Sequence, residues 1–359
     1  MNKYLNPVKY YKKIQYILLR ISVYKFSFRS NKTKTIYLFG VPLHNNLGDQ
    51  AIVNAQISFL NKFLPEYNIE IIYEGLYNLA AKKILANLQK DDVIAIPGGG
   101  NMGDVWEAYE IERENIISKF KDTGNKIISF PQSYNFTKTE KGNALKERAN
   151  NIYSKSDNLT IFARESLSFE KMKNNFNVKN QIEFVPDIVF SLNKRNYDVV
   201  RQNIMTVLRS DRELLPNQSK ADILHYVNKT YTKVYSSDTI TNFIPNIISN
   251  NRRDTLLKDK WLEFSASKIV ITDRLHGMIF AYITGTPAIV FDNQNHKVKN
   301  SYNDWLSDVE YIHFADDYSA AELQNLIRKY MNIDNFMGEP SNLINDSSYD
   351  ALIGSFQRK

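Results

Sequence analysis

The fold is decided by residues 35–74, TIYLFGVPLHNNLGDQAIVNAQISFLNKFLPEYNIEIIYE. This stretch opens and closes on short runs rich in β-branched and aromatic residues, Thr35–Phe39 and Ile69–Glu74, which are typical of buried strands. Between them, apolar residues recur on one helical face, at Ile52, Ala55, Phe59, Leu60, Phe63 and Leu64. A strand, a helix and a second strand in this order predict a βαβ unit with parallel strands.

The same alternation continues along the rest of the chain. Further strands are expected at Val93–Ile96, Lys126–Phe130, Thr160–Ala163, Ile182–Val185, Met205–Leu208, Tyr231–Tyr235, Ile269–Thr272, Ala288–Phe291 and Tyr311–Phe314. A polar stretch without apolar periodicity, Ser191–Asp198, interrupts the series. The sequence therefore predicts an α/β protein with two Rossmann-like domains, residues 35–195 and 196–335, each with a parallel sheet. A helix at Ala320–Met331 is expected to end the second domain, before a polar C-terminal tail at residues 336–359.

The positive charge is concentrated in an N-terminal arm, residues 1–34. The formal net charge of the 359 residues is +7, yet nine lysines and arginines precede residue 35 and no acidic residue occurs before Asp49. The remainder is therefore slightly acidic, and its charge does not support nucleic-acid binding. Apolar residues recur at helical spacing in the arm, at Tyr10, Ile14, Ile17, Ile21 and Tyr24. Two interpretations stay open: a helix lying on an anionic membrane surface, and a helix packed on the domain behind it.

Composition narrows the class of protein. With 43% apolar and 24% charged residues, the chain has the composition of a soluble globular protein. It has no cysteine, which excludes disulfides, zinc ribbons and thiol nucleophiles and favours a reducing, cytoplasmic setting. No apolar run is long enough to span a membrane, and no signal peptide is expected.

Two glycine-containing segments follow predicted strands. In open α/β sheets, ligands bind at the carboxyl ends of the strands, so segments placed there converge on one crevice. The first segment, Gly40–Asp49, leads into a helix, and its Asn46 and Asp49 are candidate binding residues or simply a βα turn with a capping aspartate. The second contains Gly98, Gly99, Gly100 and Asn101 and matches G-x-G-x-x-G. We reject an NAD site because the motif is not in the first βαβ unit; an anion-binding nest and a structural turn remain.

Cationic side chains follow three further predicted strands. Arg164 and Glu165 come after Thr160–Ala163, where the arginine could bind a carboxylate or phosphate, or form a surface pair with the glutamate. After Ile269–Thr272 come Arg274, Leu275 and His276, which combine a fixed positive charge with a group that can move a proton. Arg209 and Lys297 lie at similar positions in the second domain. The sequence contains no H-E-x-x-H, Walker A lysine or G-x-S-x-G, so neither a metal site nor serine hydrolysis is expected.

In their order and spacing these segments resemble the polysaccharide pyruvyl transferase family. The matching pieces span about residues 35–310 and include Asn46–Asp49, Pro97–Asn101, Phe162–Ser166, Val185–Asp187, Leu208–Arg209, Thr272–Gly277, Gly285–Pro287 and Lys297–Trp305. The resemblance implies a GT-B-like pair of domains with a cleft between them. It also implies transfer of pyruvate from phosphoenolpyruvate to a sugar of a polysaccharide precursor, as a cyclic ketal, without a further cofactor.

The resemblance also implies roles for individual residues. Arg164, Arg274, Leu275 and His276 correspond to the donor site of the family, and His276 is expected to transfer the proton with Asp187 or Glu165 as its partner. Lipid-linked acceptors would suit a basic arm that docks at the inner face of the membrane. Two other interpretations stay open: a GT-B glycosyltransferase that uses a nucleotide sugar, and a non-catalytic binding protein on the same scaffold.

Overall fold

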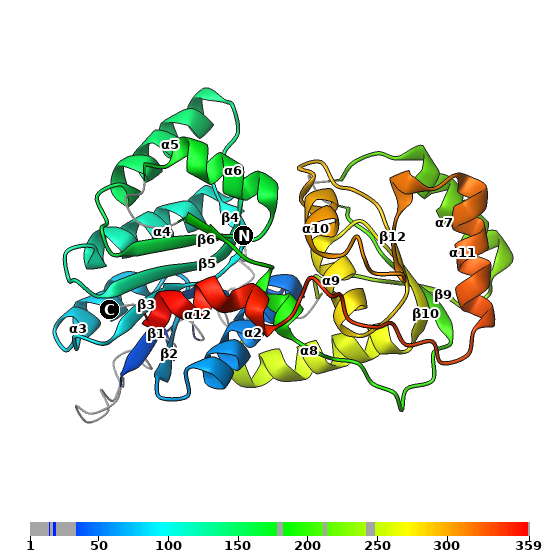
Figure 1. The fold of residues 1–359 in the computed structure, drawn as a ribbon, viewed down its shortest axis with the longest axis horizontal. Coiled ribbons are helices and arrows are strands. Elements are labelled where there is room, and N and C mark those ends of the chain that lie inside the picture. The colour runs from blue at the N-terminus through cyan, green and yellow to red at the C-terminus, as the bar shows by residue number, and fades with distance from the viewer. Residues whose placement is uncertain are drawn as a thin grey trace, which may run out of the picture.

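The computed structural model describes residues 14, 17, 18, 34–177, 182–210, 214–241 and 248–357. The predicted N-terminal arm therefore lies outside the described residues except at Ile14, Ile17 and Leu18 (and Lys34), and these three apolar residues are helical and exposed. Two parallel sheets, each with its own helices, form two lobes that stand side by side (Figure 1). The predicted α/β architecture of two Rossmann-like domains is confirmed.

The first sheet has seven strands in the order β2-β1-β3-β5-β6-β7, with β4 paired to β5. The strands are β1 (Thr35–Val41), β2 (Asn68–Tyr73), β3 (Val93–Ile96), β4 (Gly99–Met102), β5 (Lys126–Tyr134), β6 (Leu159–Ala163) and β7 (Ile182–Phe184). The helices of this domain are α2 (Leu47–Phe63), α3 (Tyr77–Leu85), α4 (Glu107–Phe120), α5 (Glu140–Tyr153) and α6 (Ser166–Asn175), with the 3₁₀ helices η1 (Asp104–Trp106) and η2 (Ile188–Ser191). Six of these strands match those expected from the apolar runs.

Both faces of this sheet are buried. Along β1, Ile36 and Leu38 belong to one apolar core, whereas Tyr37 and Phe39 belong to another. Because successive side chains of a strand point to opposite faces, a strand covered by helices on both sides is apolar throughout. This explains why the strands read as continuous apolar runs in the sequence.

The second sheet has five parallel strands in the order β12-β11-β10-β8-β9. They are β8 (Asn203–Val207), β9 (Val234–Ser237), β10 (Ser267–Thr272), β11 (Ala288–Val290) and β12 (Ile312–Phe314). The helices are α7 (Gln218–Thr230), α8 (Asn250–Ser265), α9 (Leu275–Ile283), α10 (Lys297–Trp305) and α11 (Ala320–Asn332), with the 3₁₀ helix η3 (Ala315–Asp317). The positions of these strands also follow the sequence prediction.

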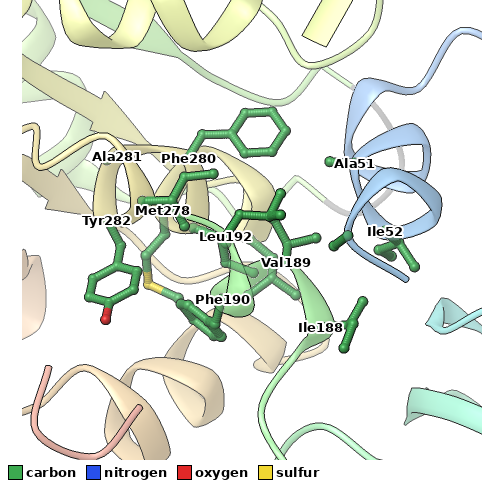
Figure 2. Packing of buried hydrophobic residues seen from close by; sticks show 14 of the residues in the cluster. Ala51, Ile52, Ile188, Val189, Phe190, Leu192, Met278, Phe280, Ala281 and Tyr282 are labelled. Carbon is green, nitrogen blue, oxygen red and sulfur yellow. The ribbon is translucent and has the colours of Figure 1, made fainter. Parts of the chain in front are cut away.

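The two domains share one apolar core. Figure 2 shows Ile188, Val189, Phe190 and Leu192, in and just after η2, between side chains of α2 and side chains of α9. Buried Arg253 of α8 adds a polar contact, because its Nε donates to Gln50 Oε1 of α2 at 2.7 Å. Helices of both domains are thus packed against each other at the base of the cleft.

The C-terminal segment differs from the expected polar tail at residues 336–359. It returns to the first domain and ends in η4 (Asp346–Tyr349) and α12 (Asp350–Gln357), which lie against that lobe (Figure 1). Tyr349, Leu352 and Phe356 are buried, and the Phe356 ring lies 6.1 Å from that of Phe130. The segment is thus an apolar strap across both domains. Among the described residues, no helix has the length and apolar character needed to cross a membrane.

Candidate functional site

A cavity of about 340 Å³ opens between the carboxyl ends of the two sheets. Its wall is made of residues from both domains, which are His44, Asn45, Asn46, Asp49, Gly100, Asn101, Trp106, Tyr109, Arg164, Arg209, Thr239, Ile240, Arg274, Leu275, His276 and Lys297. This volume is at the lower end of the range of about 300–1,000 Å³ for small-molecule sites. The segments that the sequence placed at strand ends therefore meet at one site.

Most of the candidate residues from the sequence line this cavity. They are Asn46, Asp49, Gly100, Asn101, Arg164, Arg209, Arg274, Leu275, His276 and Lys297. Four other candidates, Gly98, Gly99, Glu165 and Asp187, are not part of the cavity wall. The contacts of these four show that they support the residues that do line it.

Arg164 is held rigidly at the carboxyl end of β6. Its side chain is buried, Nε donates to Ser133 Oγ at 2.8 Å, and NH1 donates to Asp187 Oδ2 at 2.7 Å. Burial acts to lower the pKa of Arg164, but the carboxylates of Asp187 and Glu165 raise it above its ordinary value. The side chain is therefore a permanent cation whose remaining nitrogen, NH2, lies beside Gly100. The interpretation of Arg164 and Glu165 as a surface pair is wrong.

Glu165 lies behind Arg164. Its Oε2 accepts a hydrogen bond from Ser133 Oγ at 3.0 Å, its Oε1 accepts another from Ser168 Oγ, and Oε2 is 3.5 Å from Arg164 Nε. Burial raises the pKa of Glu165, which Arg164 and the two serines oppose. With both oxygens engaged by neighbouring side chains, Glu165 orients Arg164.

His276 lies in the first turn of α9, directly after β10. Its Nε2 is 3.8 Å from Asp187 Oδ2 and has no hydrogen-bond partner among the described residues. Burial lowers the pKa of His276 to about 4; Asp187 and Asp49 oppose this shift, and Arg164 and Lys297 add to it. The ring is therefore neutral at pH 7. The pKa of the ring depends on nearby charge, so any anion that enters the cavity raises this pKa and favours the protonated form.

Gly48 fixes the position of the His276 ring. A Cβ atom at residue 48 would lie 2.3 Å from His276 Nδ1, closer than two such atoms can approach. The first turn of α2 therefore contacts the imidazole through the backbone of Gly48, with no side chain between them. Glycine is required here for close packing.

Arg274 contributes a second cation from the second domain. Its Nε lies 2.7 Å from Asp238 Oδ1, and its NH2 donates to Asp238 Oδ2 at 2.9 Å. The preceding residue, Asp273, points elsewhere: it is buried, pairs with Lys220 Nζ at 2.8 Å and accepts a hydrogen bond from the backbone N–H of Arg209 at 2.8 Å. Asp273 thereby fixes the loop that presents Arg209 to the cavity.

Lys297 begins α10, and this helix is anchored to the first domain beside Arg164. Trp305 Nε1 donates to the backbone oxygen of Arg164 at 2.9 Å, and Asp304 Oδ2 accepts from the backbone N–H of Ser166 at 2.7 Å. A Cβ atom on Gly100 would lie 3.1 Å from Arg164 NH2 and 3.7 Å from Lys297 Nζ. The two cations therefore meet at Gly100, where the absent side chain leaves room.

The glycine segment forms a short strand, whereas the sequence had left open an anion-binding nest and a structural turn. Residues Gly99–Met102 form β4, which pairs in parallel with the carboxyl half of β5. Gly98 packs so closely that a Cβ atom would lie 2.6 Å from the Pro131 carbonyl oxygen, and Gly99 has a φ of +133°. Gly98 and Gly99 are thus structural. Gly100 and Asn101 line the cavity, and Asn101 Oδ1 accepts a hydrogen bond from Arg113.

The segment before α2 places three polar side chains in the wall. Asn46, not Asp49 as expected, caps the helix: its Oδ1 accepts from the backbone N–H of Gly48 at 3.0 Å. Asp49 lies in the first turn, where its Oδ2 accepts from Asn46 Nδ2 at 2.8 Å and is 3.7 Å from His44 Nε2. Asp49 is the one carboxylate among the described wall residues.

Sequence reasoning missed several wall residues, which are His44, Asn45, Trp106, Tyr109, Thr239 and Ile240. Thr239 and Ile240 enter the wall because an antiparallel bridge joins Ile240 to Asn46, and Leu47 N donates to Thr239 O at 2.7 Å. No local pattern signals such an interdomain contact. The tryptophan just after the glycine segment, Trp106, was the signal in the sequence that could have indicated this part of the wall.

Within the described ranges, no three histidine or acidic side chains are close enough together to hold a metal ion. The described part of the wall presents four cationic side chains, one carboxylate, two histidines and the aromatic rings of Trp106 and Tyr109.

Comparisons with known proteins match this chain to one family model and to several relatives. The model of the family described as "Polysaccharide pyruvyl transferase" matches residues 46–295. General stress protein 30 of Bacillus subtilis (strain 168) is 32% identical over 326 residues, which cover 91% of this chain and 92% of that protein. Pyruvyl transferase 1 of Schizosaccharomyces pombe is 30% identical over 290 residues, 76% of this chain and 70% of that protein. Among solved structures, the Methanocaldococcus jannaschii UDP-GlcNAc 2-epimerase in complex with UDP-GlcNAc and UDP aligns with a TM-score of 0.49 and 11% identity over 91% of this chain and 100% of that chain.

Proposed function

The chain belongs to the polysaccharide pyruvyl transferase family, and we propose that it transfers the pyruvyl group of phosphoenolpyruvate to a sugar of a polysaccharide precursor, forming a cyclic ketal. The family match confirms the resemblance inferred from the motifs. The identity of the donor and the form of the product are our proposal.

The observation that carries the proposal is the charge of the cavity. Among the described residues of the wall, four side chains are cationic, Arg164, Arg209, Arg274 and Lys297, and one is a carboxylate. Asp187 and Asp238 pair with two of the arginines from outside the wall. Phosphoenolpyruvate is a small anion with a carboxylate and a phosphate, and arginine pairs with both kinds of group through two parallel hydrogen bonds. Because Arg164 and Arg274 are already held by Asp187 and Asp238, they are oriented before the donor arrives.

His276 supplies the proton in the proposed mechanism. The negative charge of the donor raises the pKa of His276 from its low value in the free protein, so the ring takes up a proton as the donor binds. It then gives that proton to the methylene carbon of the donor, and the adjacent carbon becomes electrophilic. Asp187, 3.8 Å from Nε2, stabilises the charged ring, whereas Glu165 is engaged by serines and orients Arg164.

Two hydroxyls of the acceptor complete the reaction. The first attacks the electrophilic carbon, forms a C–O bond and loses its proton. The second attacks the same carbon and loses its proton to the phosphate, which departs with the electrons of its C–O bond. The product is the cyclic ketal, and inorganic phosphate is released without a change of oxidation state.

A turnover assay tests this function. The protein is incubated with phosphoenolpyruvate and a panel of oligosaccharides, and the release of phosphate and the mass of each saccharide are measured. We expect phosphate release that requires a saccharide and yields a pyruvylated product. Transfer from UDP-sugars or GDP-sugars, with phosphoenolpyruvate untouched, would instead establish the glycosyltransferase alternative.

We also propose that the acceptor is lipid-linked and that the basic arm docks the enzyme at the inner, cytoplasmic face of the membrane. The support is the cluster of nine cationic residues and the exposure of Ile14, Ile17 and Leu18 on a helix. Co-sedimentation with phosphatidylglycerol vesicles tests this. We expect binding that weakens when Lys9, Lys12 and Lys13 are replaced by glutamate, and equal sedimentation of both proteins would refute it.

A further inference from the structure

Two exposed apolar side chains lie in the wall of the cavity, one from each domain. Trp106, at the end of η1, is 43% exposed, and Ile240, in the loop that bridges to Asn46, is 36% exposed. Small-molecule sites are commonly lined by accessible aromatic and aliphatic side chains, which lose contact with water when a ligand with an apolar surface covers them. Their position indicates that a ligand with an apolar surface covers them.

Aromatic and polar groups surround this apolar surface. The ring of Tyr109, from the first turn of α4, meets the ring of His44 edge-on, with centroids 6.1 Å apart. Burial raises the pKa of Tyr109 well above its ordinary value, and the nearby carboxylates of Glu74 and Asp49 add to the shift, so the phenol is neutral. The described wall therefore combines a cationic part, in which Arg164 and Lys297 meet at Gly100, with an aromatic part formed by aromatic and neutral polar side chains.

Asp49 lies close to residues of both parts: its Oδ2 is 3.7 Å from Nε2 of His44, and it also lies beside Gly99, the residue before Gly100. Its charge acts on the pKa values of Arg164 and His276 in the cationic part and on that of Tyr109 in the aromatic part. Its Oδ2 is held by Asn46, and its Oδ1 faces Gly99, where a Cβ atom would lie 3.7 Å away. A carboxylate in this place can accept a proton from a group that bridges the two parts.

We propose that Trp106, Tyr109 and Ile240 form the subsite for the acceptor sugar ring, and that Asp49 accepts the proton of its attacking hydroxyl. A pyranose has an apolar C–H face, which would stack on Trp106, and a polar edge, which His44 and Asn45 can hydrogen-bond. The first hydroxyl then points towards the donor at Gly100. As its oxygen bonds to the electrophilic carbon, its O–H bond breaks and the proton passes to Asp49.

This inference rests on the proposed function for the identity of the reaction, but the sugar subsite can be tested without the donor. Saturation-transfer NMR with a panel of methyl hexopyranosides reports contact of a sugar C–H face with the protein, even at weak affinity. We expect transfer to at least one hexoside with wild-type protein. Trp106→Ala should weaken its binding about tenfold, because a stacked aromatic contact is lost, and Trp106→Phe should restore most of it.

Tyr197→Ala is the matched control, because Tyr197 is 73% exposed and lies outside the cavity wall. It should behave as wild type. Equal hexoside binding by the wild type and Trp106→Ala would overturn the proposal. Trp106-dependent saturation transfer to the base of uridine diphosphate, with no transfer to any hexoside, would also overturn it. In turnover, we expect Trp106→Ala to raise KM for the acceptor about tenfold while phosphoenolpyruvate affinity stays unchanged.

The proposed reaction and the proposed sugar subsite can be refuted independently of each other. If phosphoenolpyruvate does not bind but Trp106-dependent hexoside binding is found, the donor assignment fails and the subsite stands. If phosphoenolpyruvate binds and Trp106→Ala leaves both hexoside binding and acceptor KM unchanged, the subsite fails and the proposed reaction stands.

The role of Asp49 as the base has its own test. Asp49→Asn should lower kcat at least about a hundredfold with little change in either binding constant, and full activity would refute this role.

Discussion

At the scale of single residues, the site depends on close contacts that keep a neutral imidazole next to fixed cations. His276 is buried against Gly48 and lies near Asp187, which in turn holds Arg164. Replacing one of these residues therefore affects its neighbours. Glycine at position 48 is the most sensitive, since its hydrogen atom occupies space that no side chain can share with the ring.

We predict that Gly48→Ala inactivates the enzyme without unfolding it. The new methyl group would lie 2.3 Å from His276 Nδ1, so the ring must move. A displacement of about 1 Å in a reacting group can lower kcat about a hundredfold. Turnover and the melting temperature of the variant and the wild type provide the measurement; near-normal turnover in a folded variant would show that the ring position is unimportant.

Sequence reasoning identified the charged residues of the site because a parallel sheet gathers its strand ends at one edge. Arg164, Arg274 and His276 each follow a recognisable strand. Ile240 could not be identified in this way, because its place depends on how a loop of one domain bridges to the other. Tyr109 was missed because it lies on a helix, and His44 belongs to the candidate segment Gly40–Asp49 but was not singled out. The supporting role of Glu165 was also invisible, since it requires knowing that Ser133 and Ser168 lie within hydrogen-bond distance.

At the level of helices and strands, the glycine segment forms a strand that local sequence patterns could not predict. The apolar run predicted a strand at Lys126–Phe130, but β5 continues to Tyr134. Its additional residues pair with Gly99–Met102, which converts an expected loop into β4. The pairing partner lies more than thirty residues away along the chain, so no local propensity reveals it.

β12 carries a second buried histidine that links stability to pH. Both ring nitrogens of His313 have hydroxyl partners, Tyr318 at 3.1 Å and Tyr330 at 3.0 Å. Burial lowers the pKa of His313 to about 4, and Lys329 adds to the shift. Below pH of about 6.5 the unfolded chain takes up a proton that the folded protein excludes, so stability is lost as the pH falls towards about 4.

We therefore predict that His313→Gln reduces the pH dependence of unfolding. The decrease in the free energy of unfolding between pH 7 and pH 5 should be smaller in the variant by about 2 kcal/mol. Urea denaturation at both pH values measures it, with exposed His225→Gln as the control. If His313→Gln and the control lose the same stability on acidification as the wild type, His313 titrates normally in the folded protein.

At the scale of the whole molecule, two domains are tied together by a continuous core and by the C-terminal strap. The strap was expected to be a polar tail because its apolar residues are sparse. Its contacts reach the first domain: Tyr349 OH donates to the backbone oxygen of Asp187 at 3.0 Å, and Phe356 packs near Phe130. The spacing of Tyr349, Leu352 and Phe356 indicates one apolar helical face, but the surface that buries it lies about 160 to 230 residues earlier.

We predict that the strap stabilises the assembled pair of domains. Phe356→Ala should lower the free energy of unfolding by about 3–5 kcal/mol, the usual cost of truncating a buried phenylalanine. Leu343→Ala, in the same segment but 45% exposed, should cost far less. Urea denaturation of the full-length variants gives both values, and equal stabilities would mean that the strap only rests on the surface.

Phosphoenolpyruvate should bind in the cavity, and His276 should take up a proton as it binds. Calorimetric titration of the donor at pH 7, in buffers of different ionisation enthalpy, measures affinity and proton uptake together. We expect saturable binding that tightens as the pH falls, uptake of up to about one proton that disappears in His276→Gln, and weaker binding in Arg274→Gln. Titration of UDP-sugars runs alongside. Saturable binding of a UDP-sugar with no response to phosphoenolpyruvate would contradict the claim.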